Sequence, residues 1–222
     1  MTFVESVRSA ARRSGVDLPE AMIDACARHF ALLGTWNRTH NLTRIVEPEE
    51  AARAHYLDCL MPLLDWPAPA TFVDIGSGAG FPGLLAALAW PQARGTLIEP
   101  ARKRASFLTL AVHALALDAR VRVAGIVEQV ELGDRVLSRA TFPPGERAKL
   151  AGRAADEGEV VVWAHPHDLS TWEAEVATWG FRSLPARHYR VEGLEPRCLL
   201  RATAAPRRDV PRGTPGATER CT

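Results

Sequence analysis

Lysine is nearly absent from this chain of 222 residues, and cysteine is sparse. Only Lys103 and Lys149 are lysines, although the chain holds 27 residues of the lysine and arginine types. The four cysteines are scattered, with no C-x-x-C pair, which argues against a zinc site and against a disulfide framework. We therefore expect a cytoplasmic protein without a metal centre.

Long apolar runs and a strong net charge are missing as well. No apolar run approaches the roughly 20 residues that a membrane span needs, and residues 1–14 lack the apolar core of a signal peptide. The formal net charge is only +1, so no global basic field indicates a nucleic-acid partner. We expect a monomer that does not contact membranes.

The composition is that of a globular protein, with 47% hydrophobic residues, which suffices for one α/β core and a small appendage. Apolar residues at helical spacing predict a helical N-terminal extension over residues 1–66, with one helix at 48–64. Residues 204–222 are rich in Pro, Arg, Gly and Thr, and we expect them to form a basic, disordered tail.

Predicted strands and helices alternate between these ends, in residues 67–203. The strands are expected at 71–75, 95–99, 120–124, 134–138, 158–164, 180–190 and 196–202. The helices are expected at 82–90, 101–117, 144–155 and 168–178. This alternation is typical of a doubly wound, mostly parallel sheet with helices on both faces. The last two strands have no helix between them, which predicts an antiparallel pair.

The most informative motif is a glycine-rich turn after the first predicted strand. The chain reads V-D-I-G-S-G-A-G-F-P-G over residues 73–83. Gly76, Gly78 and Gly80 let the backbone turn tightly and let a ligand approach without Cβ atoms in the way. The N–H groups of the following helix then point at the ligand. This arrangement predicts a nucleotide pocket.

Two nucleotides fit such a turn. Residues 78–83 match G-x-G-x-x-G, the fingerprint of NAD-binding proteins. An acid also ends each of the first two strands: Asp74 suits the amino group of a methionine moiety, and Glu99 lies where an acceptor for ribose hydroxyls is expected. This pattern favours S-adenosylmethionine (SAM) over NAD. The alternatives are that Asp74 caps the turn and that Glu99 is an acid at a helix N-terminus.

Motifs outside the turn narrow the function. W-N-R-T-H-N-L-T occupies residues 36–43, H-Y-L-D residues 55–58, R-K-R residues 102–104 and S-R-A residues 138–140. Together with the glycine turn, these motifs resemble the bacterial 16S rRNA guanine-N7 methyltransferases of the RsmG or GidB type. The resemblance covers about residues 20–140.

The resemblance implies a class I SAM-dependent methyltransferase fold, and methyl transfer to N7 of a guanine in the decoding region of 16S rRNA. It implies SAM as the cofactor and 16S rRNA or the 30S subunit as the partner. With the residues of the turn, the expected cofactor-binding set is Asp74, Gly76, Gly78, Gly80, Phe81, Glu99, Val127, Glu128 and Arg139. Phe81 is expected on the rim of the turn. Guanine N7 carries a free lone pair and needs no general base, so the sequence identifies no certain catalytic residue. Arg139 is the one candidate.

Basic residues in two segments are candidates for contacts with rRNA phosphates. Residues 102–104 open a predicted helix, and residues 197–222 hold six arginines against two acids. The candidates are Arg102, Lys103, Arg104, Arg207 and Arg208.

The chain departs from the family pattern at two positions. Ile126 stands where the family usually has an arginine, and Ala164 where it usually has the lysine of an L-K-G motif. His165 or His167 could replace that lysine. These departures motivate an alternative function, that of a SAM-binding paralogue with another substrate or without activity.

Overall fold

The structure is a computed structural model that describes residues 1–125, 133–147, 150 and 154–204. The expected tail from residue 205 onward therefore lies outside the described residues. Among the helices of the described ranges, none is long and apolar enough to cross a membrane.

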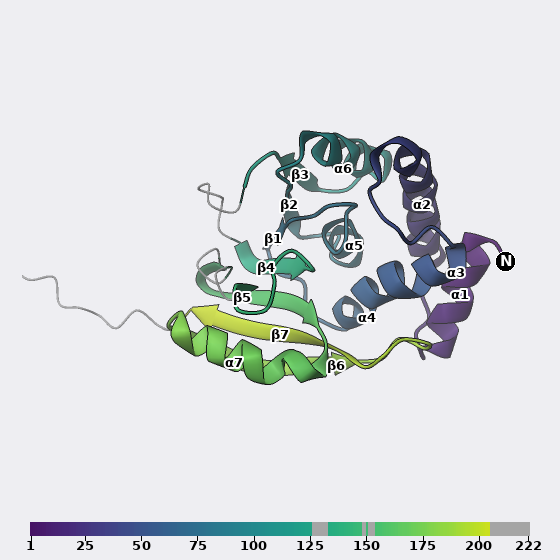
Figure 1. Cartoon of the computed structure of the whole chain (residues 1–222). Helices are drawn as coiled ribbons and strands as arrows, with labels where there is room; N and C mark the ends of the chain where they lie inside the picture. The colour runs from purple at the N-terminus through teal and green to yellow at the C-terminus, as the bar shows by residue number, and fades with distance from the viewer. Residues whose placement is uncertain (126–132, 148–149, 151–153, 205–222) are drawn as a thin grey trace, which may run out of the picture.

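The core of the molecule is a seven-stranded sheet (Figure 1). Its strands are β1 (Thr71–Ile75), β2 (Arg94–Ile98), β3 (Ala119–Arg122), β4 (Gly133–Arg139), β5 (Ala154–Ala164), β6 (Phe181–Tyr189) and β7 (Arg197–Ala204). They lie in the order β3-β2-β1-β4-β5-β7-β6. The first five are parallel, and β7 is antiparallel to both of its neighbours. The mostly parallel sheet and its antiparallel final pair, both expected from the sequence, are thus confirmed.

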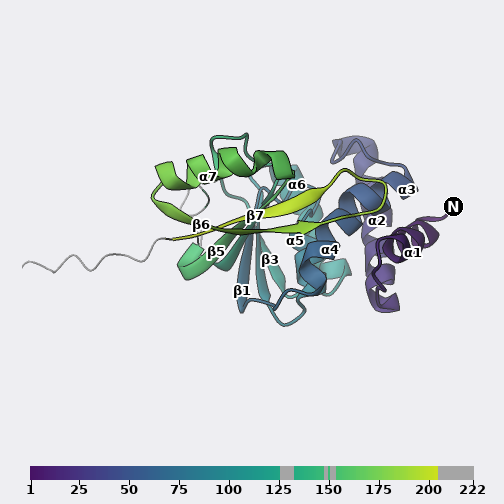
Figure 2. The same ribbon diagram turned by 90° about the horizontal axis from the view of Figure 1, so that it is seen from below.

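Helices precede the sheet and connect its strands. They are α1 (Phe3–Arg13), α2 (Glu20–His40), α3 (Pro48–Ala51), the π-helical segment η1 (Ala52–Leu57), α4 (Asp58–Leu64), α5 (Gly83–Ala89), α6 (Arg102–Ala114), the 3-10 turn η3 (Pro166–Asp168) and α7 (Leu169–Thr178). Figures 1 and 2 show α1, α2 and α3 together at one end of the molecule, far from α7. The division of the chain into an extension and a sheet domain stays a prediction.

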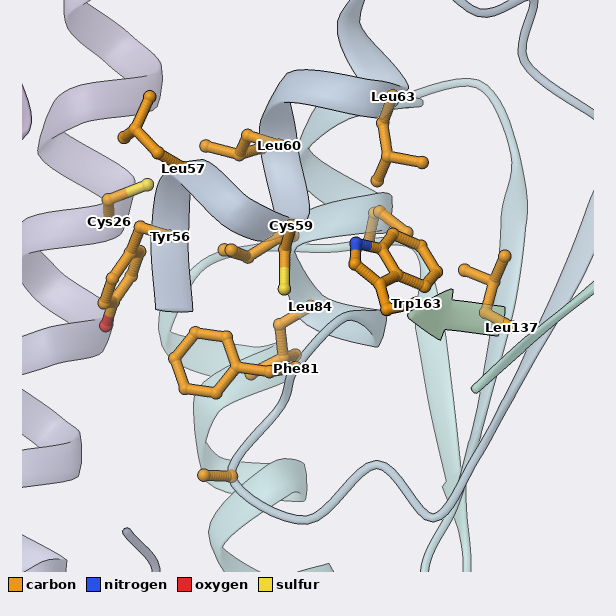
Figure 3. Close-up of a cluster of buried hydrophobic side chains, with 14 of the residues drawn as sticks. Cys26, Tyr56, Leu57, Cys59, Leu60, Leu63, Phe81, Leu84, Leu137 and Trp163 are labelled. Carbon is orange, nitrogen blue, oxygen red and sulfur yellow. The ribbon is translucent and has the colours of Figure 1, made fainter. Parts of the chain in front are cut away.

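Side chains alternate between the two faces of the sheet, because successive residues of a strand point to opposite sides. Phe72 of β1 packs in the cluster that holds α4, α5 and α6, whereas Val73 packs in the cluster that holds α7. The first cluster also contains Phe3 of α1 and Ile23 of α2, so the N-terminal helices share one continuous core with the sheet. Figure 3 shows part of it, where Trp163 of β5 lies near α4.

One predicted element is wrong. No α-helix occurs in the described part of residues 144–155: residues 144–146 form a turn, residues 147 and 150 are 3-10 helical, and β5 already begins at Ala154. Gly145 has φ 94°, outside the helical region. The carboxylate of Glu175 on α7 accepts hydrogen bonds from the backbone N–H groups of Gly145 and Arg147, which fixes the turn. The sequence pattern could not reveal this partner, some thirty residues away.

Candidate active site

The glycine turn leaves β1 at the carboxyl edge of the sheet and is anchored to the next strand. The N–H groups of Gly76 and Ser77 donate to the carbonyl of Ile98, over 2.9 and 3.1 Å. Within the turn, the N–H of Gly80 donates to the carbonyl of Ser77 over 2.7 Å. Parallel α/β sheets bind their ligands at this edge, so the turn lies where a nucleotide pocket is expected.

The glycines of the turn serve different purposes. Gly76, Gly78 and Gly80 have φ values of 77°, 55° and 95°, which glycine adopts most easily. A Cβ on Gly76 would collide with the side chain of Thr141, and one on Gly80 with that of Leu84. A Cβ on Gly78 would meet only the carbonyl oxygen of Gly76, at 3.8 Å. The space beside Gly78 is therefore open, and a ligand can approach the backbone there.

Glu99 lies directly after β2 and faces the open part of the turn. Its Oε2 accepts the N–H of Gly78 over 2.9 Å, and its Oε1 accepts the N–H of Ala101 over 3.0 Å. The second bond ties this acid to Ala101, the residue that precedes α6, although Glu99 itself lies outside the first turn of that helix. Each carboxylate oxygen keeps a further lone pair. The donor and acceptor set beside Gly78 therefore fits a ribose diol, as SAM requires.

Asp74 lies beneath the turn. Its side chain is fully buried, and Oδ2 accepts the N–H of Gly83 over 2.9 Å. Oδ1 is buried without a hydrogen-bond partner in the described part of the chain. Burial raises the pKa of this carboxyl group to about 7. The structure thus assigns Asp74 to holding the turn on β1; the expected direct contact with a cofactor would require it to leave this position.

Phe81 does not lie on the rim of the turn, where the sequence placed it. It is buried and packs among three rings of the N-terminal helices. It stacks on His55 with centroids 4.5 Å apart, and meets His29 and Tyr56 edge-on at 5.3 and 5.2 Å. Figure 3 shows Phe81 pointing toward Tyr56. The expectation is corrected because the extension covers the ring, an association that no local sequence signal indicates.

Arg139, at the end of β4, is held by the H-Y-L-D motif. Its Nε donates to Oδ2 of Asp58 over 3.1 Å, and Nη2 donates to the carbonyl of Ala54 over 2.5 Å. Asp58 is fully buried, and its Oδ1 accepts from Arg197 Nε over 3.0 Å and from the Tyr189 hydroxyl over 2.8 Å. Two guanidinium groups thus share one carboxylate, and the cluster carries one positive charge in excess.

His55 joins this cluster through Arg139. Its Nδ1 lies 3.4 Å from Arg139 Nη1, and its Nε2 lies 2.9 Å from the hydroxyl of Thr43. Burial, with Arg139 as the next cause, lowers the pKa of His55 to about 4, so the ring is neutral at pH 7. Arg139 therefore links His55 to Asp58.

A cation lies on the strand next to the position of the missing family lysine. Ala164 ends β5 and is paired with Cys198 of β7, so Arg197 begins the neighbouring strand beside it. Nη1 of Arg197 lies 2.5 Å from Nε2 of His165, and the His165 ring stacks on His167 with centroids 5.2 Å apart. The sequence singled out the two histidines but counted Arg197 only among the arginines of residues 197–222, because strand pairing was needed to place it.

The remaining candidates are only partly placed. Arg102, Lys103 and Arg104 are exposed on the first turn of α6, immediately after Glu99. Ile126, Val127, Glu128, Arg207 and Arg208 lie outside the described residues. A search of the described residues finds no group of three His, Cys, Asp or Glu side chains that could hold a metal ion.

The fold has counterparts among solved methyltransferases. Magnesium protoporphyrin IX methyltransferase from Synechocystis PCC 6803, solved with bound SAH, superimposes with a TM-score of 0.56 at 13% identity. The superposition covers 84% of this chain and all of that one. At this identity the likeness shows the fold alone, which is that of the class I SAM-dependent methyltransferases, as the sequence predicted.

Two sequence relatives carry the name ribosomal RNA small subunit methyltransferase G. The protein from Methylobacillus flagellatus is 38% identical over 139 residues, which are 61% of this chain and 67% of that protein. The protein from a Roseiflexus species is 32% identical over 216 residues, 89% of each chain. The family model GidB, described as rRNA small subunit methyltransferase G, matches residues 22–191. The chain therefore belongs to the GidB family of small-subunit rRNA methyltransferases.

Proposed function

We propose that the protein transfers a methyl group from SAM to N7 of a guanine in the decoding region of 16S rRNA. The observation that carries this proposal is the open backbone at Gly78 beside the carboxylate of Glu99. This pair offers a close approach for a nucleoside and an acceptor for its ribose hydroxyls. Membership of the GidB family supports rRNA as the substrate.

The reaction depends on the orientation of the two reactants more than on proton transfer. When bound, SAM supplies an electrophilic methyl group, and the neutral guanine base attacks it with the lone pair of N7. The protein contributes to catalysis by holding N7 of the guanine close to the methyl group and in line with it. His29 is buried and His55 partly buried beside the turn, with the pKa of each lowered to about 4, and they suit a packing and hydrogen-bonding role.

Charge at the strand ends favours an RNA substrate. The buried carboxylate of Asp58 balances only one of the two guanidinium groups of Arg139 and Arg197. The excess positive charge suits a phosphate of the RNA backbone, which positions the nucleic acid without reading its sequence. The exposed residues 102–104 add positive charge at the start of α6.

A second candidate function rests on Ala164. This residue is buried and apolar where the family pattern has a lysine, which favours a paralogue with a changed substrate. Arg197 on the adjacent strand supplies a cation beside the same position and therefore favours rRNA. The two functions differ in whether 16S rRNA accepts the methyl group.

The test is transfer of labelled methyl from SAM to 30S subunits that lack the family's modification. We expect label in 16S rRNA with the native protein and none with Gly78→Asp, whose side chain fills the open space beside the turn. Titration of SAM by calorimetry accompanies the assay. SAM binding without label in the RNA would favour the paralogue, and the absence of SAM binding would overturn the proposal.

A further inference from the structure

His29 of α2 connects the glycine turn to the N-terminal helices through two hydrogen bonds. Its Nε2 lies 3.1 Å from the carbonyl oxygen of Ala79, 50 residues away in the middle of the turn. Its Nδ1 lies 2.8 Å from the hydroxyl of Tyr56 in η1. His29 and Tyr56 are both fully buried.

The partners of His29 fix its protonation and tautomer. A carbonyl oxygen can only accept, so Nε2 must carry the hydrogen and donate to Ala79. Nδ1 is then the acceptor of the neutral ring, and the Tyr56 hydroxyl donates to it. Burial lowers the pKa of His29 to about 4, which agrees with a neutral ring. The direction of both bonds is therefore determined: the Tyr56 hydroxyl donates to His29, and His29 donates to the carbonyl of Ala79. These two bonds form a hydrogen-bond relay.

The peptide unit between Ala79 and Gly80 is held at both of its ends, and the relay holds its carbonyl end. The carbonyl of Ala79 accepts from His29, and the N–H of Gly80 donates to the carbonyl of Ser77 over 2.7 Å. The flanking glycines, Gly78 and Gly80, both have positive φ and would otherwise let this peptide rotate freely. The orientation of the peptide determines the shape of the turn next to the open space at Gly78.

Ring packing reinforces the relay from three sides. The His29 ring meets Phe81 edge-on at 5.3 Å and lies 5.8 Å from Phe107 of α6. The Tyr56 ring meets Phe3 of α1 edge-on at 4.8 Å. The relay is thus surrounded by the N-terminal helices, the turn and α6, and these contacts leave it little freedom to rearrange.

We propose that His29 and Tyr56 are positioning residues of the cofactor site, through which the N-terminal helices set the conformation of the SAM-binding turn. The inference rests on the proposed function for the identity of the ligand. It adds that the extension is part of the cofactor site, although neither side chain faces the ligand. The two residues act through the Ala79–Gly80 peptide.

Three variants and one control test the relay. Tyr56→Phe removes the first hydrogen bond and keeps the ring, and His29→Leu removes both bonds. His29→Gln restores a side-chain N–H that can donate to Ala79. Ile23→Ala is the control, because Ile23 is buried in the same helix and takes no part in the hydrogen bonds or ring pairs of the relay.

The first readout is hydrogen exchange of the Gly80 amide without SAM. We expect faster exchange in Tyr56→Phe and His29→Leu, recovery in His29→Gln, and native exchange in Ile23→Ala despite its lower melting temperature. Equal exchange in all variants would overturn the inference. This readout needs no ligand, so it tests the relay even if the protein does not bind SAM.

The second readout is the dissociation constant of SAM, measured well below the melting temperature of every variant. The loss of one hydrogen bond that orders the turn is expected to weaken SAM binding about fivefold to tenfold, with KM for rRNA unchanged. His29→Gln and Ile23→Ala should bind SAM like the native protein. Native SAM affinity in His29→Leu would contradict the inference, whereas failure of the native protein to bind SAM would contradict the proposed function.

Discussion

Arg139 and Asp58 form a partly buried ion pair across 81 residues of sequence, with Nε of the guanidinium 3.1 Å from Oδ2 of the carboxylate. The pair connects the end of β4 to the first residue of α4. Arg197 of β7 contacts the other carboxylate oxygen, so one side chain joins three elements at the carboxyl edge of the sheet.

Removing the charge of Asp58 should destabilise the fold. Asp58→Asn leaves two largely buried guanidinium groups without a balancing carboxylate, and breaking such a buried pair typically costs at least about 3 kcal/mol. Urea denaturation measures the loss. Asp65→Asn is the matched control: Asp65 also pairs with an arginine, Arg187, but is largely exposed, and the change should cost less than about 1 kcal/mol. Equal losses in the two variants would contradict the central role of Asp58.

Two alanine substitutions in the glycine turn should separate folding from ligand binding. Gly76→Ala collides with Thr141 in the folded protein, so a large loss of stability is expected. Gly78→Ala meets open space, and its cost is limited to the positive φ, about 1 to 2 kcal/mol. The new methyl group occupies the approach of the ligand, so SAM binding should weaken strongly. Thermal unfolding and calorimetry measure the two effects, and native SAM affinity in Gly78→Ala would place the ligand elsewhere.

The sequence predicted the sheet and the turn because both follow local rules. Alternating strands and helices, and glycines directly after an apolar strand, are readable without knowledge of the tertiary structure. The strand-end position of Glu99 followed in the same way, from the length of one β-α-β unit. Family motifs then indicated the cofactor and the substrate class.

The partners of the site residues could not be predicted in this way. Phe81 was expected at the rim but lies under His55, and Arg197 was counted only among the arginines of residues 197–222 but shares the carboxylate of Asp58 with Arg139. His29 was not predicted as a site residue, because a single histidine in a predicted helix does not by itself indicate a functional site. Each of these contacts joins segments far apart in the sequence, and the packing of the N-terminal helices and the pairing of β5 with β7 decide them.

The stability of the protein should fall as the pH is lowered from about 6.5 to 4. His29 and His55 have pKa values lowered to about 4 in the folded protein, mainly by burial, so the unfolded chain binds more protons in this window. Each histidine then contributes a slope of at most about 1.4 kcal/mol per pH unit. Urea midpoints at pH 7.5 and pH 5 measure the change. His29→Gln should reduce the slope, and an unchanged slope would contradict the buried neutral ring.

Asp74 should have the opposite effect on the pH dependence of stability. Its pKa is raised to about 7 by burial, so between about pH 4 and 7 the folded protein binds more protons at this carboxyl group than the unfolded chain. Its contribution to stability is therefore full at low pH and is lost as the pH rises to 7. Asp74→Asn, which cannot ionise, should make the protein lose stability more steeply on acidification than the native protein does. A shallower dependence in this variant would indicate that Asp74 is ionised throughout.

Positive charge at the start of α6 should strengthen binding of rRNA. Lys103→Ala is expected to weaken binding and to reduce the dependence of the logarithm of affinity on salt by about one unit, as the loss of one phosphate contact does. Arg182→Ala, another exposed cation at the start of β6, is the control and should leave binding unchanged. Filter binding to 16S rRNA at several salt concentrations measures both. Identical salt dependence in the two variants would place the RNA away from α6.

The most direct test of the account identifies the methylated nucleoside. 30S subunits lacking the family's modification are incubated with the protein and labelled SAM, and the 16S rRNA is digested to nucleosides and separated. The account predicts label in 7-methylguanosine from the decoding region. Label in another nucleoside, or in no RNA while SAM is bound, would contradict it.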